Sequence, residues 1–157
     1  MTIANITRGI LRCLLATMLA GAIPAQAASA GGNLQIRDGY VREMPPGQST
    51  SVAFMNIVNN GARPVGIVAA SCDCAQTASV HTHSHDNNGM MQMVEVKRLE
   101  IPARGTVQLA PGGYHLMLVN LKRSLRAGEQ VSVTLLDDEG KSYTAKLPVI
   151  KMLGTSP

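Results

Sequence analysis

Aromatic residues are scarce in this chain of 157 residues. Tryptophan is absent, and aromatic residues make up 3% of the sequence. Proteins that hold single-stranded nucleic acid stack its bases on aromatic rings, so this composition argues against that role. The formal net charge is +4, and it falls to +2 when Arg8 and Arg12 of the N-terminal segment are left out. So small a charge supplies no basic surface, and we expect no nucleic-acid partner.

Acidic residues are missing from the N-terminal segment. None precedes Asp38, and Arg8 and Arg12 flank the start of an apolar stretch over residues 14–23. The small residues Ala25-Gln26-Ala27 follow it, an arrangement typical of a secretory signal with its cleavage site. We therefore predict that residues 1–27 are a cleaved signal peptide.

Long apolar runs are missing as well. The stretch over residues 14–23 is shorter than the roughly 20 apolar residues that a spanning helix needs, and no later segment approaches that length. Cys13 precedes the apolar core, so it does not stand where a lipoprotein cysteine would. We predict that residues 28–157 form one soluble, exported domain, monomeric and without a membrane span.

A helical period is also absent beyond the signal segment. Short apolar or alternating runs recur instead, and turn sequences such as Asn59-Asn60-Gly61 and Pro111-Gly112-Gly113 separate them. This pattern predicts an all-β chain, a sandwich or barrel of antiparallel strands. The expected strands are residues 34–36, 52–58, 65–70, 79–83, 90–96, 106–109, 114–119, 131–136 and 143–149.

Cysteines are few: Cys72 and Cys74 are the only ones after the signal segment. Three interpretations remain open for this C-x-C sequence. The two residues can form a small-ring disulfide, which is the interpretation we favour, or a pair of thiolates that binds additional Cu(I). They can also be two small buried residues, which is less expected in an oxidising compartment.

Histidine and methionine, by contrast, gather in one stretch. Residues 81–117 hold every histidine of the chain and four of the seven methionines beyond the signal segment. The histidines are His81, His83, His85 and His115, and the methionines are Met90, Met91, Met93 and Met117. Met55, in an apolar run, is expected in the core. Met44 is expected in a loop, where it either has no role, which we favour, or shields a metal site.

A turn sequence, Asp86-Asn87-Asn88-Gly89, divides this stretch and predicts a β-hairpin over residues 79–97. A hairpin centred on Asn87 would place His81 opposite Met93 and His83 opposite Met91. Both pairs would share one face, because residues two apart in a strand point the same way. His115 and Met117 share a face of another strand by the same rule.

Imidazole and thioether donors together indicate a site for Cu(I). Thioether sulfur is soft and selects Cu(I), whereas zinc would ordinarily take thiolate or carboxylate. Individually, each methionine fits a core position and each histidine a turn. As a set on matching faces, they favour a metal site.

The spacing of these residues resembles that of the PCu(A)C family of periplasmic copper chaperones. The family motif is His, ten residues, Met, twenty-one residues and His-x-Met. Met93 and His115-Leu116-Met117 match the second interval, whereas eleven residues separate His81 from Met93. The extra residue leaves His81 or His83 as the first ligand.

The resemblance implies a cupredoxin-like Greek-key β-sandwich or barrel in a single domain. It also implies a Cu(I) carrier, not an enzyme, with His81, Met93, His115 and Met117 as ligands and His83 and Met91 as alternates. The family motif does not include Cys72 and Cys74, so an accessory copper site there is a separate possibility, second to the disulfide. The implied acceptor is the copper centre in subunit II of cytochrome c oxidase, or a thiol-disulfide copper assembly protein. The alternatives are a copper-buffering or resistance protein and a thiol oxidoreductase that uses the two cysteines.

Overall fold

The structure is a computed structural model that describes residues 33–85 and 88–151. Its regular elements are ten β-strands, and the described residues contain no helix, so none there is long and apolar enough to cross a membrane. The strands are β1 (Leu34–Arg42), β2 (Thr50–Asn59), β3 (Val65–Cys72), β4 (Ala75–His85), β5 (Met91–Glu95), β6 (Leu99–Ile101), β7 (Thr106–Leu109), β8 (His115–Leu121), β9 (Gln130–Asp137) and β10 (Ser142–Ile150).

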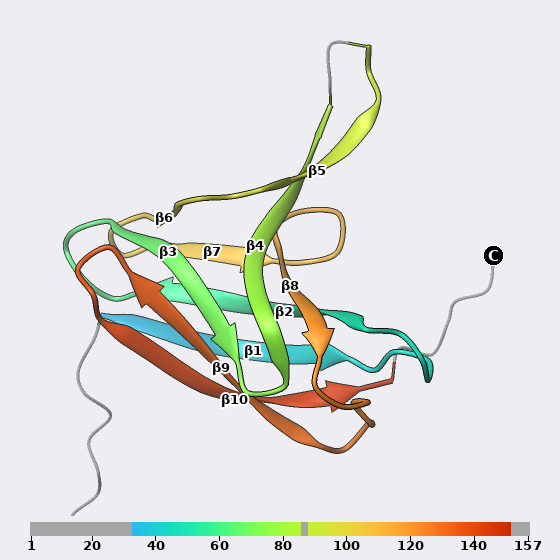
Figure 1. The fold of residues 1–157 in the computed structure, drawn as a ribbon. Helices are drawn as coiled ribbons and strands as arrows, with labels where there is room; N and C mark the ends of the chain where they lie inside the picture. Colours follow the sequence, from blue (N-terminus) through green and yellow to red (C-terminus); the bar gives the residue numbers. More distant parts are fainter. Residues whose placement is uncertain (1–32, 86–87, 152–157) are drawn as a thin grey trace, which may run out of the picture.

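Seven of these strands form a closed barrel in the order β3-β4-β8-β2-β1-β10-β9 (Figure 1). The pairing of Ala70 with Ala78 joins β3 to β4 and closes the ring. Three further strands extend the sheet, since β5 pairs with β4, β6 with β3 and β7 with β2. The predicted all-β, cupredoxin-like barrel in a single domain is thereby confirmed.

The strand predictions differ from the structure in three respects. The three-residue strand β6 was not expected, because so short a run carries little periodicity. Strand β1 continues well beyond Ile36, across an irregularity at Asp38, whose φ of 51° lies in the left-handed region. The barrel is also not purely antiparallel, because β1 and β10 run parallel through the Val41–Val149 pair.

Glycine at position 39, next to this irregularity, leaves room for the side chain of Leu147. A Cβ atom there would lie 2.4 Å from Cδ2 of Leu147, far inside van der Waals contact. The side chain of Leu147 on β10 therefore packs directly onto the backbone of β1.

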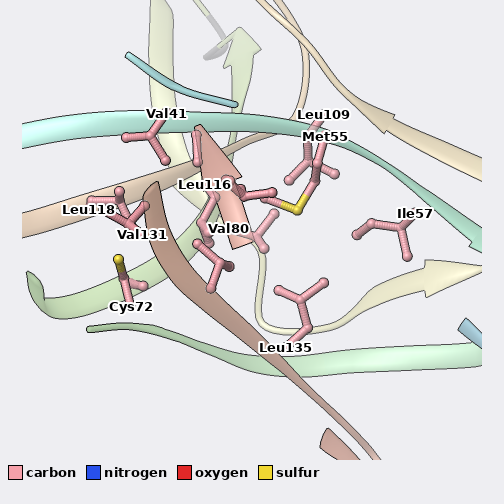
Figure 2. Packing of buried hydrophobic residues seen from close by; sticks show 14 of the residues in the cluster. Val41, Met55, Ile57, Cys72, Val80, Leu109, Leu116, Leu118, Val131 and Leu135 are labelled. Atoms are coloured by element: carbon pink, nitrogen blue, oxygen red, sulfur yellow. The ribbon is translucent and has the colours of Figure 1, made fainter. Parts of the chain in front are cut away.

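The barrel interior is filled almost entirely by aliphatic side chains, which explains how the domain folds with so few aromatic residues (Figure 2). On β8, Leu116 and Leu118 are fully buried in this core. Side chains alternate along a strand, so His115 and Met117 point to the outer face of the barrel wall. Met55 is buried in the core, as predicted.

The hairpin of β4 and β5 extends beyond the barrel (Figure 1). Its inner half is a barrel strand, since β4 pairs with β8 from Ala75 to His81. Its outer half pairs only with β5, and all five residues of β5 are exposed. The outer face of β8 and the inner part of this hairpin therefore meet where the hairpin leaves the barrel.

Candidate metal centre

The hairpin register brings His83, not His81, opposite Met93. The observed pairs are His81 with Glu95, His83 with Met93 and His85 with Met91, so the predicted pairs are wrong. The turn is centred one residue later than expected, next to Gly89, whose φ of +77° favours glycine. Moving a turn centre by one residue moves every cross-strand partner by two and leaves each side chain on its predicted face.

Strand β8 lies on the other side of β4 and contributes the remaining donors. His81 pairs with His115, and Ser79 pairs with Met117, so all these side chains share the outer face of the sheet. The ring centroids of His83 and His115 are 5.4 Å apart, and those of His81 and His115 are 6.2 Å apart. The predicted sharing of one face between the hairpin and β8 is confirmed.

Four of the candidate donors line one pocket of about 330 Å³ on this face: His83, Met93, His115 and Met117. Residues 50–52 and 54 of β2 also line it, and its wall is completed by Pro111, Gly112, Arg42, Met44 and Gln48. Met44 belongs to this wall, although the sequence favoured a loop position without a role. Met91 and His81 do not line the pocket: Met91 lies farther out on the hairpin, and His81 pairs with His115.

The imidazole of His115 is held in an orientation that suits metal binding. It is 6% exposed, and its Nδ1 lies 3.0 Å from the carbonyl oxygen of Gly113. A carbonyl can only accept, so Nδ1 carries the proton and donates it. The lone pair of Nε2 is therefore available to a metal, an arrangement common in histidine ligands.

His81 and His83 each bury a ring nitrogen without a partner. Nδ1 of each ring is inaccessible to water and makes no hydrogen bond. Buried polar atoms are almost always hydrogen-bonded, and an unsatisfied one costs about 1–3 kcal/mol. A bound metal would give such a nitrogen the partner that the protein itself does not supply.

Burial also keeps His81 in the form that binds metals. Removal from water lowers the pKa of its imidazole below 6.5, Glu95 raises this pKa, and His115 and Lys97 lower it. Only the neutral ring has a lone pair to donate, so the lowered pKa favours ligation at neutral pH.

Imidazoles alone do not complete a site here. Within the described part of the chain, Cys72, Asp73 and Cys74 are the only three His, Cys, Asp or Glu residues whose donor atoms all lie within 4.8 Å of one another. The histidines of the outer face do not converge in this way, so a metal held there needs the thioethers. Such a mixed donor set suits Cu(I) better than zinc.

Cys72 and Cys74 form the disulfide that the sequence favoured. Both cysteines are buried, at the end of β4 away from the pocket. Cys74 and His81 are seven residues apart, which corresponds to about 23 Å along a strand. The cysteines therefore cannot bind the same ion as His115.

The chain belongs to the LpqE-like family: the family model described as "Putative lipoprotein LpqE-like" matches residues 34–149. It is 31% identical over 156 residues to "Putative lipoprotein Lxx21020" of Leifsonia xyli subsp. xyli, covering 99% of this chain and 90% of that protein.

Solved structures with this fold include copper-binding proteins. The solution structure of apo-DR1885 from Deinococcus radiodurans is 33% identical, with a TM-score of 0.59 over 87% of this chain and 96% of that one. The solution structure of CuI-DR1885 is 31% identical, with a TM-score of 0.60 over 85% and 83% of the two chains. The apo PCuAC domain from PmoF1, at 21% identity, covers 77% of this chain and 96% of its own with a TM-score of 0.66. This last likeness concerns the fold alone, which is that of the PCuAC domain.

Proposed function

We propose that this protein binds Cu(I) through His83, Met93, His115 and Met117 and carries it in the periplasm, without acting as an enzyme. The observation that carries the proposal is the convergence of two imidazoles and two thioethers in one pocket, beside buried ring nitrogens without partners. All four donors are neutral, and soft sulfur selects Cu(I). The Cu(I) form of DR1885 supports the same cargo.

His81 is the alternative first ligand. The PCu(A)C spacing does not choose between them, because eleven residues separate His81 from Met93 and nine separate His83 from it, whereas the pocket contains His83, which lies opposite Met93. The rings of both residues approach His115, so either can supply a nitrogen to the same ion. We assign the role to His83 because it is the one that shares a pocket with both thioethers.

Delivery to an acceptor follows from the nature of the donors. Thioethers are uncharged and Met93 is half exposed, so an incoming thiolate can replace the ligands one at a time. We propose, as the resemblance implies, that the acceptor is the copper centre of cytochrome c oxidase subunit II or a thiol-disulfide copper assembly protein. Export is supported by the N-terminal segment and by relatives named as lipoproteins.

Copper buffering would use the same site and differ only in the fate of the ion. Catalysis by Cys72 and Cys74 is less well supported, because both sulfur-bearing side chains are almost entirely buried. A thiol oxidoreductase needs an accessible sulfur for attack by its substrate.

The proposal is tested by anaerobic Cu(I) titration of the purified protein against a colorimetric chelator. Met93→Leu, Met117→Leu and His115→Asn should each weaken binding about tenfold or more, since each removes one donor. Met55→Leu is the matched control, because it makes the same thioether-to-alkyl change in the core. Wild-type affinity in any two of the three site variants would refute the assignment.

A further inference from the structure

A second pair of soft donors lies farther out on the hairpin. His85 and Met91 are direct cross-strand partners, one step beyond His83 and Met93 on the same face. Directly paired residues have Cβ atoms about 4.5–5.5 Å apart, close enough for one ion to bridge an imidazole and a thioether. The two pairs are about 6.6–6.8 Å apart, the distance covered by two residues of a strand.

The outer pair is more exposed than the inner pair, in which Met93 is 51% exposed and His83 is half-buried. Met91 is 65% exposed and His85 is also exposed, whereas His115 in the pocket is 6% exposed. Met91 adds nothing to the barrel core, since strand β5 is exposed along its whole length. Met90, Met91 and Met93 are all exposed within four residues, and such a cluster of exposed apolar side chains points to a binding role.

We propose that His85 and Met91 form a second, weaker Cu(I) site through which the ion enters and leaves the pocket. It rests on the proposed function, because it serves the ion bound at His83 and Met93. Two neutral donors bind more weakly than four, so the outer pair can pass the ion in either direction. Each step exchanges one ligand bond for another, copper stays Cu(I) and no electron or proton is consumed.

The outer pair also determines which side of the molecule meets a donor or acceptor. The hairpin extends beyond the barrel, so a partner can reach His85 and Met91 without opening the pocket (Figure 1). The disulfide of Cys72 and Cys74 lies at the opposite end of β4 and takes no part.

The experiment uses Ag(I), a soft ion that needs no reductant, so the Cys72–Cys74 disulfide stays intact. All proteins carry Cys13→Ser, which removes the one cysteine outside that disulfide. The test variant combines His85→Asn with Met91→Leu. Its matched control combines Thr82→Asn with Val94→Leu, a directly paired couple on the opposite face of the same hairpin.

Methionine-methyl NMR during the Ag(I) titration resolves the two sites. In the wild type and the control, the first equivalent should shift Met93 and Met117, and a second should shift Met91. The test variant should keep the first equivalent at unchanged affinity, lose the second and release the ion to a chelator more slowly. A wild type that takes up only one equivalent, or a test variant that retains the second or loses the first, would overturn the inference. Failure of the first equivalent in the wild type would refute the proposed function instead.

Discussion

Replacing His83 with leucine should stabilise the metal-free protein while it abolishes tight copper binding. The metal-free protein buries Nδ1 of His83 without a hydrogen bond. Such an atom costs about 1–3 kcal/mol, and an apolar side chain of comparable size removes that cost. Allowing for imperfect repacking, we expect His83→Leu to raise the free energy of unfolding by about 1 kcal/mol, or Tm by roughly 3–6 °C.

The same substitution at His81 should have a smaller effect on stability. Nε2 of His81 lies 2.9 Å from Oγ of Ser79, and leucine would lose that hydrogen bond. The loss of about 0.5–1.5 kcal/mol offsets the gain from removing the buried Nδ1. We therefore expect the free energy of unfolding of His81→Leu to stay close to that of the wild type.

Copper affinity also distinguishes the two histidines, but here the larger effect of His83→Leu is a loss. His83→Leu removes a donor that lines the pocket and should weaken Cu(I) binding about tenfold or more, whereas His81→Leu should weaken it less. Denaturant unfolding of the metal-free proteins and chelator competition on the same preparations give both quantities. Ser84→Leu, at an exposed position on the opposite face of the hairpin, controls for the general effect of adding leucine there. A His83→Leu protein that is less stable than the wild type, or that binds Cu(I) equally tightly, would refute the assignment of His83.

Three further outcomes are expected. Cu(I) affinity should fall as the pH is lowered into the acidic range, because protonated imidazole cannot bind while thioethers do not titrate; a flat profile in chelator titrations would exclude histidine ligands. Replacing Cys72 and Cys74 with serine should leave the first Cu(I) equivalent intact, since these residues lie at the far end of β4; loss of that equivalent in the same titration would place them in the site. Tyr143→Phe should cost about 1.5–3 kcal/mol at neutral pH, measured by denaturant unfolding, because Tyr143 donates to the buried carboxylate of Asp137. Burial and this hydrogen bond raise the pKa of Tyr143 from 10 to about 12, so its contribution is complete below about pH 10 and is lost as the pH rises through 12; an unchanged cost at alkaline pH would contradict this.

The sequence alone determined those features that depend on neighbours along the chain. The all-β class follows from short alternating runs between turns, and each of the nine expected strands overlaps an observed one. The shared face of His81 and His83, and that of His115 and Met117, follows from the two-residue period of a strand. The disulfide of Cys72 and Cys74 is equally local, because it links residues only two apart.

Tertiary structure alone decided which residues meet. The turn of the hairpin is centred next to Gly89, and this one-residue difference placed His83, not His81, opposite Met93. Closure of the barrel through Ala70 and Ala78, and the parallel pairing of β1 with β10, depend on strands far apart in the chain. The pocket itself needs β2, β4, β5 and β8 together, with Met44 from a distant loop in its wall. A strand's periodicity determines the face of each side chain but not its partner, because the partner depends on turn geometry and on packing among all the strands.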